Sequence, residues 1–135
     1  TANFLYQSNL SSHVTAMILD SPMIDFGDVI DYGGERRGLP SFITNIGKIV
    51  AGLRFQIDWD GLDYLERVDE LTIPVLLFHG GQDRTIHHRL SNRFKSARPD
   101  LVTYVPVAGA GHVRAWNVDQ KKYETEVEYF LEALR

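Results

Sequence analysis

The chain has 135 residues, of which 44% are apolar, 11% aromatic and 24% charged, a composition that fits one domain with a packed core. Its 14 basic and 18 acidic side chains give a formal net charge of −4, which disfavours nucleic acid or anionic lipid as a partner. The absence of cysteine excludes disulfides, thiolate metal sites and a cysteine nucleophile within the chain. No apolar run is long enough to predict a membrane span, and no signal-peptide pattern opens the sequence.

The first forty residues predict a helix, a strand and a loop. Residues 1–9 contain no glycine or proline and have the apolar spacing of a short helix. Val14 to Leu19 form an apolar, partly β-branched run between polar clusters, which is typical of a strand buried on both faces of a parallel sheet. Residues 22–40 contain four glycines and several aspartates without a regular period, and we expect a loop there.

Two helices are expected between residues 41 and 67. Ser41 is a candidate N-cap for the first of them. Its apolar residues recur at helical spacing and would share one face: Ile43, Ile46, Val50, Leu53 and Ile57. A second, shorter helix is expected over residues 62–67, where Leu62 and Leu65 would share a face.

The remaining elements alternate between strand and helix. An apolar run predicts a strand over residues 75–79, closed by the glycine pair Gly80-Gly81. Residues 86–97 have a helical apolar spacing, and residues 101–107 predict a third strand. Pro106 places that strand at a sheet edge, because proline cannot donate to the ladder of hydrogen bonds.

The last predicted element is a helix with an apolar stripe over residues 123–134, for which Asn117 or Asp119 is the candidate N-cap. Strands that alternate with helices pair in parallel through right-handed crossovers. The sequence therefore predicts an α/β fold whose three parallel strands are covered by helices on both faces. We find no internal repeat or linker, and we expect residues 1–135 to form a single unit.

Ligands of an open parallel sheet gather at the carboxyl ends of its strands, and candidate catalytic side chains follow two of the predicted strands. Asp83 follows the second strand, and His112 follows the third one. A general base needs an imidazole whose far nitrogen is held by a carboxylate, which fixes the tautomer and stabilises the imidazolium. Asp83 and His112 are suitably placed for that pairing. The adjacent histidines His87 and His88 do not suggest a metal site, and we predict neither a metal nor a cofactor.

The segment TIPVLLFHGGQDRTI, followed by LVTYVPV and AGAGHVRAWN, resembles the C-terminal half of an α/β-hydrolase. The resemblance implies a serine hydrolase of the esterase, lipase or peptidase type that acts on a small-molecule ester or amide. In that family the HGxxD-like turn carries the triad acid, here Asp83, and the Gly-His loop carries the base, here His112. Some members carry the acid after an earlier strand, which leaves Asp20 as an alternative. The resemblance also implies that residues 22–72 are either a lid over the site or an ordinary crossover.

The nucleophile of that family is absent from the sequence. No Gly-x-Ser-x-Gly motif occurs, and none of the seven serines has glycines at the required spacing: Ser8, Ser11, Ser12, Ser21, Ser41, Ser91 and Ser96. In the register of the family the motif would lie just before Thr1, which is not a start methionine. We therefore expect a C-terminal fragment that supplies the acid and the base and is inactive alone. The alternative is a non-catalytic ligand-binding protein of the same fold.

A sheet that begins at Val14 to Leu19 would leave that strand without a neighbour on one side. An exposed apolar strand edge is a template for pairing with another chain. We therefore expect either self-association or pairing with the missing N-terminal half through this edge.

Overall fold

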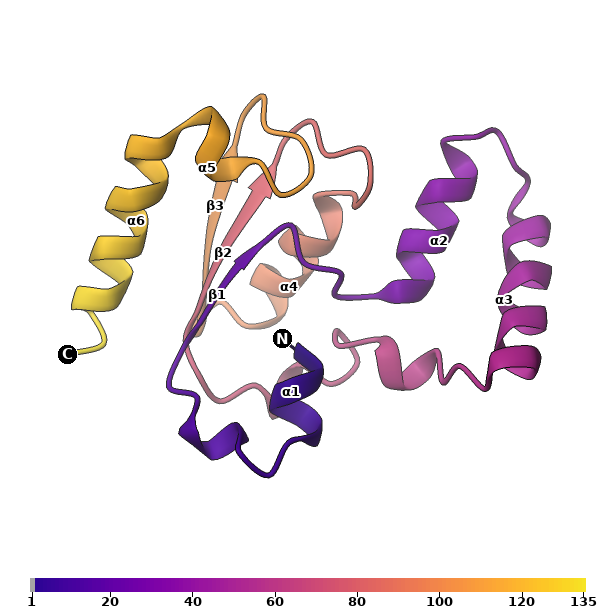
Figure 1. Ribbon diagram of the computed structural model, residues 1–135, viewed down its shortest axis with the longest axis horizontal. Helices are drawn as coiled ribbons and strands as arrows, with labels where there is room; N and C mark the ends of the chain where they lie inside the picture. Colours follow the sequence, from indigo (N-terminus) through magenta and orange to yellow (C-terminus); the bar gives the residue numbers. More distant parts are fainter. Residues whose placement is uncertain (1) are drawn as a thin grey trace.

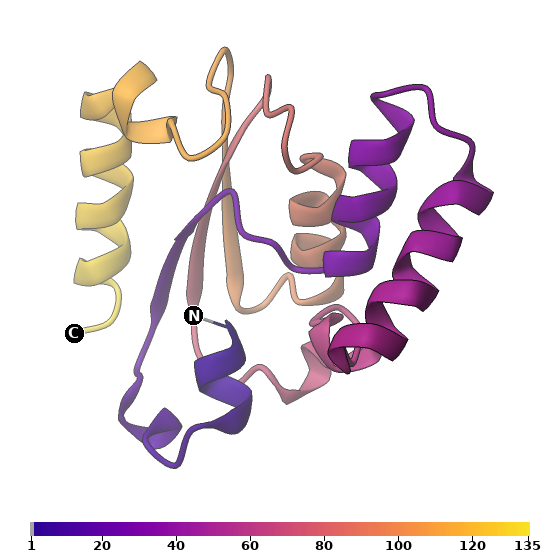
Figure 2. The same ribbon diagram turned by 45° about the vertical axis from the view of Figure 1, so that its right-hand side comes forward.

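The computed structural model describes residues 2–135 as a three-stranded parallel sheet with helices on both faces (Figures 1 and 2). The strands are β1 (Met17–Asp20), β2 (Val75–Gly80) and β3 (Val102–Val107), and they lie side by side in the order β1-β2-β3. The predicted α/β fold with three parallel strands is confirmed, and so is the edge position of the strand that contains Pro106.

Strand β1 is shorter than the predicted residues 14–19. Its ladder begins where Met17 pairs with Val75, the first residue of β2, and the Met17 amide donates to the carbonyl oxygen of Pro74 at 2.9 Å. Because Pro74 has no N–H, it cannot extend the ladder by donating to the chain before Met17. Every residue of β2 is buried, as expected for the central strand.

The two faces of the sheet carry two separate apolar clusters. Helices α5 (Ala115–Val118) and α6 (Gln120–Glu132) cover one face. Asp119, one of the two predicted N-caps, caps α6 by accepting from the Lys122 amide at 3.0 Å. On the other face lie α1 (Ala2–Gln7), the 3-10 turn η1 (Ser11–His13) and α4 (Arg89–Ala97). The first cluster contains Leu76, Phe78, Val105, Val107, Ala110, Ala115 and Phe130, and the second contains Met17, Ile24, Tyr64, Val68, Leu71, Val75, Leu77, Phe94 and Val102.

The predicted loop over residues 22–40 is wrong, because residues 26–35 form helix α2 (Phe26–Glu35). The side chain of Asp25 accepts from the Asp28 amide at 2.9 Å and caps the helix. Position 34 in this helix requires glycine, because a Cβ there would collide with the side chain of Thr44. The glycines that suggested a loop thus include one that allows two helices to approach closely.

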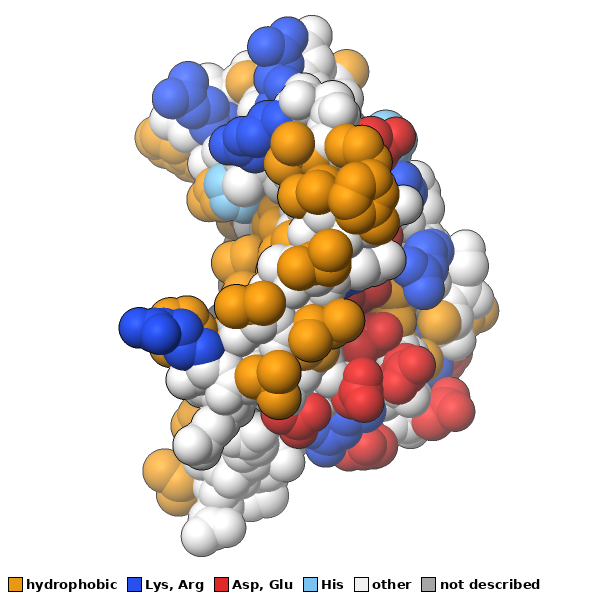
Figure 3. Space-filling model, turned by 90° about the vertical axis from the view of Figure 1, so that its right-hand side faces the viewer, with side chains coloured by type: hydrophobic (Ala, Val, Ile, Leu, Met, Phe, Trp, Pro, Cys, Tyr) orange, Lys and Arg blue, Asp and Glu red, His pale blue; other side chains and the backbone are white. Residues whose placement is uncertain are grey.

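Helix α3 (Ser41–Phe55) is confirmed as a helix, but its predicted N-cap is wrong. Pro40 occupies the N-cap position, and Ser41 makes no side-chain cap bond. The apolar stripe points to solvent, with 41% to 81% of each residue exposed in the set Ile43, Ile46, Ile49, Val50 and Leu53. Figure 3 shows apolar side chains gathered along this side of the molecule, where α3 lies beyond α2 and away from the sheet.

The predicted helix over residues 62–67 does not form. Residues 64–67 form a turn instead, and 3-10 turns flank it on either side, η2 (Asp60–Leu62) and η3 (Val68–Glu70). The side chain of Asp63 accepts from the Leu65 amide at 2.8 Å and from the Glu66 amide at 3.3 Å, which gives the backbone a local alternative to a helix.

Candidate active site

Two loops meet at the carboxyl end of the sheet, the acid loop (residues 81–88) after β2 and the histidine loop (residues 108–114) after β3. Gly80, the last residue of β2, allows their close approach, because a Cβ there would lie 2.6 Å from the carbonyl oxygen of Gly111 and would collide with that of Ala110. The Gly81 and Gln82 amides donate across the gap to the carbonyls of Val107 and Ala110, each at 2.9 Å. The HGG sequence is therefore what holds the two loops together.

The carboxylate of Asp83 is buried and accepts hydrogen bonds through both oxygens. Its Oδ1 accepts from the amides of Thr85 at 2.8 Å and Ile86 at 3.0 Å, and its Oδ2 pairs with Nδ1 of His112 at 2.9 Å. Burial alone would raise the pKa of Asp83, but the Ile86 amide, the His112 imidazole and the Thr85 amide outweigh it and hold that pKa below its ordinary value. Asp83 is therefore an ionised acceptor at neutral pH.

The imidazole of His112 is oriented by this carboxylate and still reaches solvent. Because an ionised carboxylate only accepts, Nδ1 carries the proton that His112 donates to Asp83, and Nε2 of the neutral ring has the free lone pair. The side chain is 34% exposed. A partly exposed imidazole with a fixed tautomer is equipped to take a proton from a bound hydroxyl group.

A second histidine, His79, lies behind the acid loop and is fully buried. Its Nε2 lies 3.1 Å from the carbonyl oxygen of Ile86, so Nε2 donates there and Nδ1 accepts from the Ser91 hydroxyl at 2.6 Å. Burial lowers the pKa of His79, against the opposing effects of the Ile86 carbonyl and the Asp83 carboxylate. His79 is therefore a neutral ring that ties β2 to the acid loop and to α4.

Helix α2 reaches the acid loop as well, and sequence reasoning missed these contacts because it placed a loop there. The Tyr32 hydroxyl donates to the backbone carbonyl of Asp83 at 3.4 Å, and Arg36 donates to the carbonyl of Arg84 at 2.8 Å. Asp28 pairs with Arg89 at 3.0 Å. The Asp25-x-x-Asp28 spacing, with an acidic residue three positions after a helix cap, is the signal that points to a helix start.

Asp20, the alternative acid, lies at the end of β1 and binds elsewhere. Its two oxygens accept from the hydroxyl of Ser21 at 3.2 Å and from the amide of Ala115 at 3.3 Å. The structure thus brings Asp83, and not Asp20, onto the Nδ1 atom of His112. Within residues 2–135 no group of three or more His, Asp or Glu side chains is arranged to hold a metal ion.

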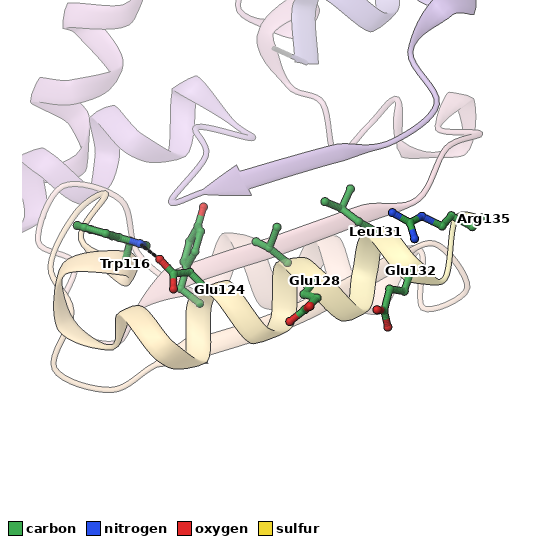
Figure 4. A pocket seen from close by; sticks show the side chains of 8 residues that line it. Trp116, Glu124, Glu128, Leu131, Glu132 and Arg135 are labelled. Atoms are coloured by element: carbon green, nitrogen blue, oxygen red, sulfur yellow. Dashed lines mark hydrogen bonds between the residues drawn. The ribbon is translucent and has the colours of Figure 1, made fainter.

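Apolar grooves lie beside β1 rather than over the Asp83–His112 pair. One groove of about 510 Å³ runs along α6, where Leu131 points toward the sheet, and Trp116 of α5 lines its other end (Figure 4). Another of about 500 Å³ is lined by β1 itself together with Met23, Phe26 and Leu62. Among the helices of the described part of the chain, none is long and apolar enough to cross a membrane.

Comparison with known proteins gives a fold and leaves the family to be established. No protein-family model and no curated protein sequence matches the chain. Two crystal structures of the Pyrococcus furiosus esterase Pf2001 match 98% of the chain, with TM-scores of 0.64 and 0.65 and sequence identities of 18% and 20%. A puromycin hydrolase matches 82% of the chain with a TM-score of 0.59 and 20% identity.

The chain spans about half of the esterase, 47% to 48% of its length, and 16% of the puromycin hydrolase. Both are α/β-hydrolase folds. The three parallel strands with their flanking helices are therefore a partial α/β-hydrolase fold, as the sequence predicted.

Proposed function

We propose that this chain supplies the acid and the base of a Ser-His-Asp hydrolase that acts on an ester or amide. The observation that carries the proposal is the 2.9 Å hydrogen bond between Nδ1 of His112 and the buried carboxylate of Asp83. In a triad, the imidazole takes the proton of the attacking serine hydroxyl and then gives it to the leaving group. The carboxylate holds the ring in the tautomer that this transfer requires and stabilises the imidazolium.

The low pKa of Asp83 supports its role as the acid of such a pair. A carboxylate that stays ionised opposite the ring favours the positive charge that His112 acquires during proton transfer. The exposed fraction of the His112 side chain leaves its second nitrogen accessible to a substrate-bound hydroxyl. The hydrolase folds of the esterase and the puromycin hydrolase support the same class of reaction.

The nucleophile of the proposed enzyme lies outside this chain, since no Gly-x-Ser-x-Gly motif occurs in it. Within residues 2–135 β1 pairs only with β2, and its other edge is open between two apolar grooves. A parallel strand added at this edge would end beside the histidine loop, at the carboxyl end of the sheet. We propose that the segment that carries the serine pairs with β1.

The isolated chain is expected to be inactive. Without a nucleophile and an oxyanion hole, the Asp83–His112 pair has no group to activate, and loss of the nucleophile alone removes about 10⁶ in rate in subtilisin. The purified chain and its Asp83→Asn variant should both hydrolyse p-nitrophenyl butyrate no faster than the rate measured without protein. If the isolated chain hydrolyses the ester and Asp83→Asn abolishes that hydrolysis, the assignment of the nucleophile to another segment is contradicted.

The complete enzyme is tested by sequencing the gene upstream of the Thr1 codon and expressing the protein with the segment found there. The proposal expects a Gly-x-Ser-x-Gly motif just before Thr1, labelling of its serine by a fluorophosphonate, and ester or amide hydrolysis. Asp83→Asn should then lower kcat by about 10⁴, because the imidazole takes the wrong tautomer. A longer protein with neither the motif nor turnover would instead support the non-catalytic, ligand-binding alternative.

A further inference from the structure

Two residues at the carboxyl end of the sheet have an unusual backbone conformation: one follows β1 and the other follows His112 in the histidine loop. Ser21 is buried and has a φ of 50°, and Val113, directly after His112, has a φ of 51°. Non-glycine residues rarely adopt positive φ, and for a β-branched residue such as valine it is a genuine outlier. Such conformations persist only where the surrounding contacts enforce them.

Hydrogen bonds between these residues supply that enforcement. The Val113 amide donates to the Ser21 hydroxyl oxygen at 3.4 Å, and the Ser21 hydroxyl donates to Asp20 at 3.2 Å. The Ala115 amide donates to the other oxygen of Asp20 at 3.3 Å. The Ser21 amide is itself anchored on the carbonyl oxygen of Phe78 in β2 at 3.0 Å. The backbone after His112 is therefore fixed to β1 by side chains more than ninety positions away in sequence.

The histidine loop is thus held on both sides of His112. Before the histidine, the carbonyl of Ala110 accepts from the Gln82 amide of the acid loop at 2.9 Å. After it, Val113 and Ala115 are held by Ser21 and Asp20. Asp83 contacts the ring itself, so the three attachments act on different parts of one short segment.

We propose that Asp20 and Ser21 are positioning residues that set the backbone after His112 and thereby keep its imidazole on Asp83. The proposal rests on the function proposed above, in which His112 is the base. Burial raises the pKa of Asp20 above its ordinary value, and the hydrogen bonds from the Ala115 amide and the Ser21 hydroxyl oppose this rise. Asp20 also lies within electrostatic reach of His112.

The readout that separates positioning from general folding is the tautomer of neutral His112, measured from the ¹⁵N chemical shifts of its two ring nitrogens in the 135-residue chain. Paired with Asp83, the ring holds its proton on Nδ1. We expect Asp20→Ala and Ser21→Gly to shift a large part of the population to the form protonated on Nε2. Ser21→Gly is chosen because glycine accepts the positive φ without strain and removes the hydroxymethyl side chain that bonds to Val113 and Asp20.

Conservative and remote variants complete the test. Asp20→Asn keeps an oxygen that accepts from the Ala115 amide, and it should retain the Nδ1-protonated form. Asp58→Ala removes a comparable bond, from the Gly61 amide at 3.0 Å, at a distant exposed turn and should leave the shifts unchanged.

Two outcomes would overturn different claims. If Asp20→Ala and Ser21→Gly both keep the wild-type shifts, the positioning role is wrong while the Asp83–His112 pair stands. If Asp83→Ala also keeps them, Asp83 does not fix the tautomer, and the proposed function loses its basis.

Discussion

At the scale of single residues, the buried ring of His79 gives the fold a specific dependence on pH. Both of its nitrogens are already used, one as a donor to the Ile86 carbonyl and the other as an acceptor from Ser91. Protonation of Nδ1 would reverse the hydrogen bond with the Ser91 hydroxyl, which can also accept, and would place a positive charge in a buried site. The lowered pKa of His79 has the same origin, because burial disfavours the charged ring.

The sign of this pH dependence follows from the direction of the shift. An unfolded histidine has a pKa of about 6.5. Between that value and the lower folded pKa, the unfolded chain binds more protons than the folded one, so the free energy of unfolding falls as the solution becomes more acidic. The contribution of His79 is complete above about pH 6.5 and decreases below it, by up to about 1.4 kcal/mol per pH unit.

We predict that His79→Gln flattens the pH dependence of stability between about pH 7.5 and 5.5. Glutamine donates and accepts hydrogen bonds but has no proton to gain in this range. Urea unfolding of both proteins at several pH values gives the slope of the free energy of unfolding against pH for each. His13→Gln is the matched control, because it removes a histidine whose side chain is exposed in η1. Equal slopes in wild type and His79→Gln would contradict the prediction.

The candidate site was predictable from the sequence to the extent that strand ends determine it. Asp83 and His112 each follow a recognisable apolar strand, and parallel pairing brings those two strand ends together. The supporting contacts were not predictable, because Ser21 and Val113 carry no sequence signal of a positive φ. Hydrogen bonds between residues 92 positions apart depend on the tertiary fold alone.

At the scale of elements, strands and helices with a clear period were predicted, and those that depend on glycine or on a local side-chain bond were not. Helix α2 contains glycines, which are poor helix formers, yet one of them is needed where α2 approaches Thr44 of α3. The helix expected near Leu62 is replaced by turns because Asp63 binds the following amides. Both errors arise where a local preference is overridden by a contact.

Helix α3 also shows that an amphipathic pattern identifies a helix without identifying what covers its apolar face. Leu53 has the spacing of a core residue but is 81% exposed, whereas Leu90 in α4 is fully buried. We predict that Leu53→Lys changes the free energy of unfolding by less than about 0.5 kcal/mol. Leu90→Ala should lower it by about 2–5 kcal/mol, through lost burial and the cavity that remains.

These two variants are compared by urea unfolding under identical conditions. Lysine is a good helix former, so the substitution at Leu53 tests burial and not helix propensity. A loss of stability for Leu53→Lys as large as that for Leu90→Ala would show that the stripe on α3 is covered in the folded protein.

At the scale of the whole molecule, the sheet is asymmetric. The edge of β3 contains Pro106, which blunts it against pairing, whereas the edge of β1 carries apolar residues and is open within the described part of the chain. Ile18 in β1 is 37% exposed, although a strand of this composition is typical of a buried position. The grooves on either side of β1 leave further apolar surface uncovered.

We predict that the chain associates with itself through β1 in the absence of another segment at this edge. Sedimentation velocity at increasing protein concentration should show species larger than the monomer. Ile18→Lys should shift the chain toward the monomer, because a charged side chain at a strand edge opposes pairing and its aliphatic stem can stay on the apolar surface. Leu53→Lys is the matched control, since it places the same charge on exposed apolar surface away from β1 and should leave the association unchanged. A wild-type chain that stays monomeric would contradict the prediction. An association that Leu53→Lys abolishes and Ile18→Lys does not would also contradict it, because the contact would then lie on α3.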